Sequence, residues 1–280
     1  MTPDALRLDQ LPALHRCVDD GALELLYQPE VDLQTGGIVA MEGLLRWHHE
    51  TLGLLTPPAF LELADASGEI LPIGEWVLRT GAAEAARWAS LPGPARRLWL
   101  NVSPAELVAE GFVQLVADVV AAHGLAPGAL GLEVAESSVV ALGPSAAPLL
   151  EDLRAAGVAL AVDDFSSFYA TLGAIGVLPV DAVKLSARYV RGVGELVGPD
   201  GDGDPLVAAV LSQAHDRGLY VVAEGVETWA EAARLTELGC DRAHGWLFAS
   251  AQRADRARWL LQHGRGWERS ASVPLPRTEA

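Results

Sequence analysis

Two adjacent aspartates, Asp163 and Asp164, directly follow small apolar residues in the segment ALAVDDF (159–165). Adjacent carboxylates repel each other, and leaving either one half-buried costs free energy unless a positive charge compensates it. Hard divalent cations prefer oxygen ligands of this kind. The pair therefore indicates a point where the chain gathers negative charge around a cation.

Other polar side chains lie near the ends of other apolar segments. In a parallel barrel the carboxyl ends of the strands meet at one rim, where barrel enzymes place their sites, so these residues are expected to converge there. So many carboxylates can stay ionised in a water-poor cleft only if cations neutralise them. The ligands are oxygen atoms and there is no cysteine cluster, which favours Mg²⁺ or Mn²⁺. Two such ions about 3.5–4 Å apart form a standard clamp for phosphate-ester hydrolysis. The converging set is Gln28, Glu42, Arg46, Asn101, Glu133, Asp163, Asp164, Lys184 and Glu224.

Apolar, β-branched segments alternate with stretches of helical period, which predicts an α/β fold, a (β/α)8 TIM-type barrel. The turn DLQTGG is too short for a crossover helix, so the first strand should pair antiparallel with the second. Ser103 with Glu106 and Thr228 with Glu231 have the spacing of capping boxes at helix starts. A helix is also predicted over 74–91, and a solvated loop over 192–205. The predicted strands are 23–29, 38–47, 97–103, 130–137, 159–165, 181–186, 219–226 and 242–248.

Length and charge restrict the function. The 280 residues suffice for one barrel domain, and the net charge of −17 argues against polymeric nucleic acid or an anionic membrane as partner. We predict no membrane segment and no signal peptide, and two distant cysteines favour a reducing, cytoplasmic location. The expected division is a linker or lead-in helix at 1–19, the barrel at 20–263 and a flexible tail at 264–280.

The ordered motifs YQP, MEGLLRW, LNVSPAEL, LEVAES, AVDDF, VKLS and VVAEGVET resemble the EAL-domain family over roughly residues 20–263. These are bacterial phosphodiesterases that linearise cyclic di-GMP, and their fold is a (β/α)8 barrel with an antiparallel first strand. The family triplet Glu-Ala-Leu reads Glu42-Gly43-Leu44 here. The resemblance implies two Mg²⁺ or Mn²⁺ ions, a homodimer, and a sensor or cyclase domain that could lie upstream and is not in this chain.

The resemblance also assigns roles. It implies that Lys184, Glu42, Asp163 and Glu224 are catalytic, with Lys184 holding the attacking water, and that Glu136 anchors the loop after Asp164. Arg46 would grip a phosphate oxygen, for which a guanidinium is well suited. The implied metal ligands are Glu42, Asn101, Glu133, Asp163, Asp164 and Glu224, and the implied substrate-binding residues are Gln28, Leu44, Arg46, Asp164, Glu227 and His244.

Several positions depart from the family pattern. Ser166–Thr171 replace a glycine-containing loop, Leu185-Ser186-Ala187 lack a carboxylate and a guanidinium, and His244 replaces a glutamine. The leading hypothesis is therefore a metal-dependent phosphodiesterase that converts cyclic di-GMP to linear pGpG through water activated by two metals, with turnover reduced by the altered loop. The alternative is a degenerate domain that binds cyclic di-GMP or a protein without efficient turnover. An unrelated aldolase with Lys184 as Schiff base is the third reading.

Overall fold

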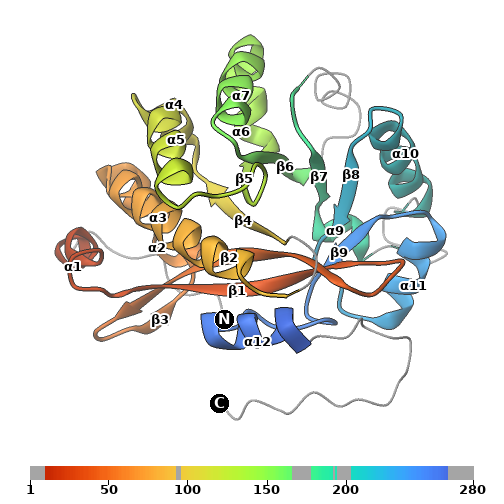
Figure 1. Cartoon of the computed structure of the whole chain (residues 1–280), viewed down its shortest axis with the longest axis horizontal. Coiled ribbons are helices and arrows are strands. Elements are labelled where there is room, and N and C mark those ends of the chain that lie inside the picture. The colour runs from red at the N-terminus through yellow and green to blue at the C-terminus, as the bar shows by residue number, and fades with distance from the viewer. Residues whose placement is uncertain (1–9, 93–95, 166–177, 192, 194–202, 264–280) are drawn as a thin grey trace.

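A closed ring of strands forms the centre of the protein (Figure 1). The computed structural model describes residues 10–92, 96–165, 178–191, 193 and 203–263. Around the ring the order is β1-β9-β8-β7-β6-β5-β4-β2, and the pairing of β1 with β2 closes it. The strands are β1 (Leu23–Asp32), β2 (Ile38–His49), β3 (Gly53–Leu55), β4 (Arg97–Val102), β5 (Leu130–Ala135), β6 (Ala159–Phe165), β7 (Ala182–Leu185), β8 (Tyr220–Ala223) and β9 (Arg242–His244).

The first strand runs against both of its neighbours. β1 pairs antiparallel with β2, where Gln28 lies opposite Glu42, and antiparallel with β9, where Glu30 lies opposite His244. All other neighbours within the ring, from β2 through β4 to β9, pair in parallel. The predicted barrel with an antiparallel first strand is confirmed. The short strand β3 extends the sheet from the far half of β2 and was not predicted.

Helices lie outside the ring (Figure 1). The outward side chains of the strands, such as Leu98, Leu132 and Val183, are buried against them in one apolar core. Both predicted capping boxes are present, with Ser103 and Thr228 each accepting from the backbone three residues later. The helices are α1 (Leu11–Arg16), α2 (Pro57–Ser67), α3 (Ile70–Ala89), α4 (Pro104–Val108), α5 (Phe112–Ala122), α6 (Glu136–Leu142), the 3₁₀ turn η2 (Gly143–Ser145), α7 (Ala146–Ala155), α9 (Ala187–Val190), α10 (Gly203–His215), α11 (Trp229–Glu237) and α12 (Ala254–His263).

The middle of the barrel interior is filled by one large ring among small side chains. Alternation along a strand sends every second side chain inward. Trp99 is 1% exposed and packs with alanines from three other strands. Gly131 leaves room for it, because a Cβ there would lie 2.2 Å from the indole ring. This layer separates the two polar ends of the interior. The alanines are Ala40, Ala159, Ala161 and Ala182.

The end near the amino termini of the parallel strands, called the base here, has a continuous polar network. Arg242 donates to buried Glu30 at 2.7 Å and lies over the ring of Tyr220 at 3.8 Å. The hydroxyl of Tyr220 in turn accepts from Arg97 at 2.7 Å, and burial raises its pKa to about 12. Arg97 also donates to the carbonyl of Gly128 at 2.8 Å. Strands β1, β4, β8 and β9 are thus tied together at the base.

Several predicted boundaries differ from the structure. The predicted strand over 219–226 ends at Ala223, where the chain turns toward the barrel rim, and the one over 242–248 ends at His244. After His244 the backbone of Gly245 approaches so closely that a Cβ would lie 2.1 Å from the carbonyl oxygen of Val226. The predicted helix over 74–91 spans Ile70–Ala89 instead.

The predicted loop over 192–205 is wrong at its end, because Asp204 belongs to α10 and forms an ion pair with Arg234 at 2.7 Å. The predicted tail at 264–280 and the altered loop at 166–171 lie outside the described residues, as do residues 1–9. α1 lies within the predicted lead-in segment.

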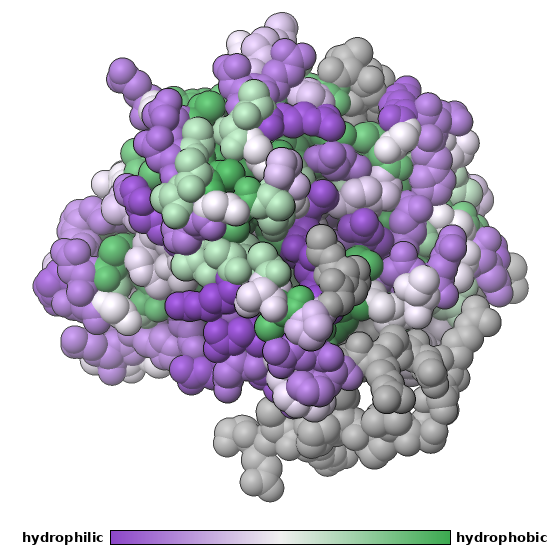
Figure 2. Space-filling model, viewed as in Figure 1, coloured by the Kyte–Doolittle hydropathy of each residue, from purple (hydrophilic) through white to green (hydrophobic). Residues whose placement is uncertain are grey.

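Hydrophilic side chains cover most of the surface seen in Figure 2, with hydrophobic patches among the helices of the outer layer. Within the described part of the chain, helices of the length and apolarity needed to cross a bilayer are absent. Cys17 and Cys240 are both buried and unpaired, as expected.

Candidate active site

The opposite end of the interior, called the mouth here, gathers acidic side chains around one lysine. Lys184 Nζ lies 2.7 Å from Glu133 Oε1 and 2.8 Å from Glu224 Oε1. It also lies 3.2 Å from Glu42 Oε2 and 3.9 Å from Asp163 Oδ1. Four of these residues come from four different strands, and Glu224 directly follows β8. The predicted convergence of distant residues at one rim is therefore present.

Strand alternation explains how Lys184 reaches this position. Val183 and Leu185 point outward into the apolar core, so the lysine between them points into the barrel. Its side chain is only 2% exposed. Burial lowers the pKa of the ammonium, but Glu133, Glu224 and the other acids outweigh burial and raise it well above its usual value. Lys184 is therefore a charged hydrogen-bond donor at neutral pH.

The acids around it are not equivalent. Burial raises the pKa of Glu42, but Lys184 and His244 outweigh burial and lower it to about 2. Burial raises the pKa of Glu224 to about 8, and Lys184 only partly offsets this. Burial likewise raises the pKa of Glu133 well above its usual value. Four carboxyl groups share a single ammonium, so the mouth has too little positive charge to keep all four ionised.

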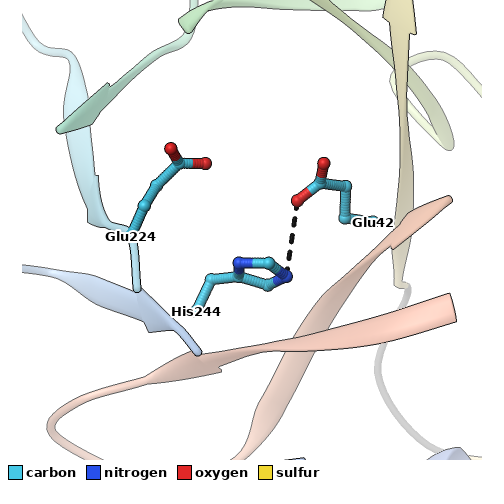
Figure 3. A group of neighbouring side chains, drawn as sticks. All are labelled: Glu42, Glu224 and His244. Atoms are coloured by element: carbon cyan, nitrogen blue, oxygen red, sulfur yellow. Dashed lines mark ion pairs between the residues drawn. The ribbon is translucent and has the colours of Figure 1, made fainter. Parts of the chain in front are cut away.

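The donor set fits a divalent cation. Glu133 Oε2 and Asp163 Oδ1 are buried and have no hydrogen-bond donor within the described ranges. One ligand atom each from Glu42, Glu224 and His244 lies within 4.8 Å of the others (Figure 3). Oxygen atoms with an excess negative charge are what Mg²⁺ and Mn²⁺ require. These residues could therefore hold a metal.

A cavity of about 380 Å³ opens onto this centre. Glu42, Asp163, Glu224 and His244 line it, whereas Glu133 and Lys184 lie beneath it. Burial lowers the pKa of the His244 imidazole. The remaining predicted residues on its wall are Gln28, Leu44 and Glu227.

Two predicted residues support the centre from its sides. Asn101 donates from Nδ2 to Glu42 Oε1 at 2.9 Å, and it is exposed at the rim. Gln28 lies beside Glu42 on β1 and is buried, and its amide donates to the carbonyl of Ala249 at 2.8 Å. Asn101 thus restricts the position of the Glu42 side chain, and Gln28 ties β1 to the segment of Ala249 beside it.

Three predicted residues lie further out. Arg46 lies beyond Glu42 on β2, where its Nη1 donates to the carbonyl of Leu45 at 2.8 Å and burial lowers its pKa. Asp164 is exposed and has a φ of +48°, a left-handed conformation that few residues other than glycine adopt. Glu136 is buried at the first position of α6. The loop that Glu136 is expected to anchor lies outside the described residues.

The sequence analysis missed one charged residue on the cavity wall. Arg191 follows the single turn of α9, is exposed, and lines the cavity near Ala187 and Trp246. Its position four residues after Ala187 places both on one side of a helical turn, which is the sequence signal that could have identified it.

Comparisons with known proteins identify the family of the chain. The EAL domain model matches residues 12–251. An uncharacterized protein of Mycobacterium tuberculosis is 38% identical over 261 residues, which is 91% of this chain and 41% of that protein. MucR of Pseudomonas aeruginosa, a bifunctional diguanylate cyclase/cyclic di-GMP phosphodiesterase, is 33% identical over 89% of this chain and 36% of its own length. The chain thus spans less than half the length of these relatives.

Solved structures give the same result. The MucR phosphodiesterase in its cyclic di-GMP complex superposes with a TM-score of 0.83 at 33% identity, covering 89% of this chain and all of that one. The EAL domain of Mycobacterium smegmatis DcpA gives 0.72 at 37% identity, covering 87% and 99%. The fold is a TIM-like barrel of the type seen in the MucR phosphodiesterase. The chain belongs to the EAL-domain family.

Proposed function

We propose that this chain is a metal-dependent phosphodiesterase that hydrolyses cyclic di-GMP to linear pGpG. The observation that carries the proposal is the excess of carboxylates around Lys184 at the open end of the barrel. Similarity to the MucR phosphodiesterase domain, whose structure holds cyclic di-GMP, supports the choice of substrate. In this reaction a water attacks one phosphorus in line and the 3′ oxygen leaves.

Divalent cations bound at the mouth would neutralise the acids, polarise the phosphoryl oxygens and increase the acidity of the attacking water. Glu42, Asp163 and Glu224, which line the cavity, would hold them, with Asn101, Glu133 and Asp164 as the remaining predicted ligands. The specific ions, Mg²⁺ or Mn²⁺, are part of the proposal.

Lys184 acts as a donor in this account. Its raised pKa keeps the ammonium charged, so it can orient a water by hydrogen bonding but cannot accept the proton of that water. The charged state of Lys184 also argues against the aldolase hypothesis, because a lysine that forms a Schiff base must be a neutral amine. Arg46 remains the proposed phosphate ligand, and Gln28, Leu44, Glu227 and His244 the proposed nucleotide contacts.

A time course of cyclic di-GMP hydrolysis tests the proposal. Chromatography should show pGpG accumulating with Mg²⁺ or Mn²⁺ and stopping on addition of EDTA. Lys184→Gln should bind the nucleotide but turn it over far more slowly. Bound but intact cyclic di-GMP under both metals would reject the proposal.

Binding without turnover is the second candidate. It is favoured by the end of β7, where Ser186 and Ala187 supply neither carboxylate nor guanidinium to the cavity. Calorimetry that shows nucleotide binding to a protein without hydrolytic activity would support it. Four expectations from the sequence remain predictions: a homodimer, an upstream sensor or cyclase domain, domain boundaries at residues 19 and 263, and a cytoplasmic location.

A further inference from the structure

His244 has an unusual position among the acids of the mouth. It is the last residue of β9, and its ring points into the barrel toward Glu42 (Figure 3). Its side chain is 12% exposed, and Nε2 lies 3.3 Å from Glu42 Oε2. That nitrogen is buried and forms no hydrogen bond with any described residue. A buried imidazole nitrogen beside the Glu42 carboxylate is therefore left without a hydrogen bond from the described residues.

The separations suit the ligands of one ion. Adjacent ligand atoms about 2.1 Å from an octahedral ion lie about 3.0 Å apart. The 3.3 Å between His244 Nε2 and Glu42 Oε2 is close to that value, and the group with Glu224 lies within 4.8 Å. Glu42 lies on β2, His244 ends β9 and Glu224 directly follows β8, so three parts of the barrel rim hold the group in place.

The ammonium of Lys184 satisfies this group only in part. It lies 2.8 Å from Glu224 Oε1 and 3.2 Å from Glu42 Oε2, but its shortest contact is with Glu133 at 2.7 Å. A cation between Glu42, Glu224 and His244 would leave the pair of Lys184 and Glu133 in place. It would also offset part of the excess negative charge of the mouth.

We propose that His244 is a metal ligand and that, with Glu42 and Glu224, it makes this centre prefer divalent transition ions such as Mn²⁺, Co²⁺ and Zn²⁺ over Mg²⁺. Imidazole suits transition ions, whereas Mg²⁺ is bound almost entirely by oxygen. The inference rests on the proposed metal dependence and adds a nitrogen ligand and a selectivity to it.

Electron paramagnetic resonance of Mn²⁺ bound to the whole chain tests the ligand directly. Protein labelled with ¹⁵N in histidine alone should show nuclear modulation from a coordinated ¹⁵N, which distinguishes His244 from the nitrogen of Lys184. His244→Gln should abolish that signal. It should weaken Mn²⁺ and Co²⁺ binding about 10–100-fold and leave Mg²⁺ binding within about two-fold.

His215→Gln is the matched control, because His215 pairs with Asp241 on the outside of the barrel and should leave the signal unchanged. Bound Mn²⁺ without histidine coupling, or equal losses for Mn²⁺ and Mg²⁺ in His244→Gln, would overturn the inference. Those results would leave the proposed hydrolysis intact. Histidine coupling in a protein that does not cleave cyclic di-GMP would instead reject the proposed hydrolysis and support His244 as a metal ligand.

Discussion

The two ends of the barrel interior both bury charged side chains, but they balance them differently. At the base, Glu30 pairs with Arg242, and Tyr220 accepts from Arg97. At the mouth, the four acids Glu42, Glu133, Asp163 and Glu224 surround one ammonium, that of Lys184. Trp99 and its layer of small residues lie between the two ends.

This difference distinguishes buried charges that stabilise the fold from buried charges that serve a function. Buried ionic groups that serve only the fold are paired and hydrogen-bonded, because an uncompensated buried charge costs several kcal/mol. The base follows that rule. The mouth does not, and a protein retains such a cluster where a bound cation completes it. The contrast predicts that substitutions at the mouth change activity, whereas substitutions at the base change stability without changing activity.

The largest expected effect is on activity at the mouth. Glu42→Gln removes one charge and keeps the shape, so cyclic di-GMP hydrolysis should fall roughly 10²–10³-fold. The stability of the metal-free protein should fall at neutral pH, because Lys184 and His244 lower the pKa of Glu42 and this stabilisation of its ionised form is lost. Chromatographic turnover and urea unfolding measure the two effects. A variant with normal turnover would remove Glu42 from the proposed mechanism.

The base should respond differently. Glu30→Gln leaves Arg242 without its anion, so the free energy of unfolding should fall by about 2–4 kcal/mol. Turnover per folded molecule should not change. Glu237→Gln is the control, because its pair with Arg234 is exposed and should contribute little to stability. Equal stabilities of the two variants would contradict the assigned role of the base.

The packing of the Trp99 layer, which lies between the base and the mouth, can be tested by substitution. Gly131→Ala places a methyl group against Trp99, so urea unfolding should show a loss of about 1–3 kcal/mol. Adding Trp99→Phe should recover part of this loss, because the smaller ring makes room for the methyl group. The substitution should break no hydrogen bond of the indole nitrogen, which has no partner in the described part of the chain. The absence of any recovery would show that the strain lies elsewhere.

The smallest expected effect is at the cavity wall. Arg191→Ala removes an exposed guanidinium, so the KM for cyclic di-GMP should rise about two- to five-fold with kcat unchanged. Arg188→Ala is the matched control on the same helical turn, because Arg188 stacks on Tyr189 and does not line the cavity. Equal effects of the two substitutions would mean that only overall charge matters.

Much of the mouth could be predicted from the sequence. Polar residues that end apolar segments, such as Asp163 and Lys184, mark the rim of a parallel barrel whatever the exact register. Alternation then places Glu133 and Asn101 on the inner face. The capping boxes at Ser103 and Thr228 are local, and they were predicted for the same reason.

The base could not be predicted, because its contacts depend on how the ring closes. Glu30 and Arg242 are 212 residues apart, and only the pairing of β1 with β9 brings them together. The same holds for His244, whose place beside Glu42 depends on the register of three strands. The sequence showed that His244 replaces the glutamine of the family pattern, but it could not show how close His244 lies to Glu42 and Glu224.

Calorimetric titration of Mn²⁺ into the wild-type chain, Glu42→Gln and Glu30→Gln tests the contrast between the two ends most directly. Saturable uptake is expected in the wild type and in Glu30→Gln, with a large loss in Glu42→Gln. No uptake by the wild type, or equal uptake by all three proteins, would contradict the account.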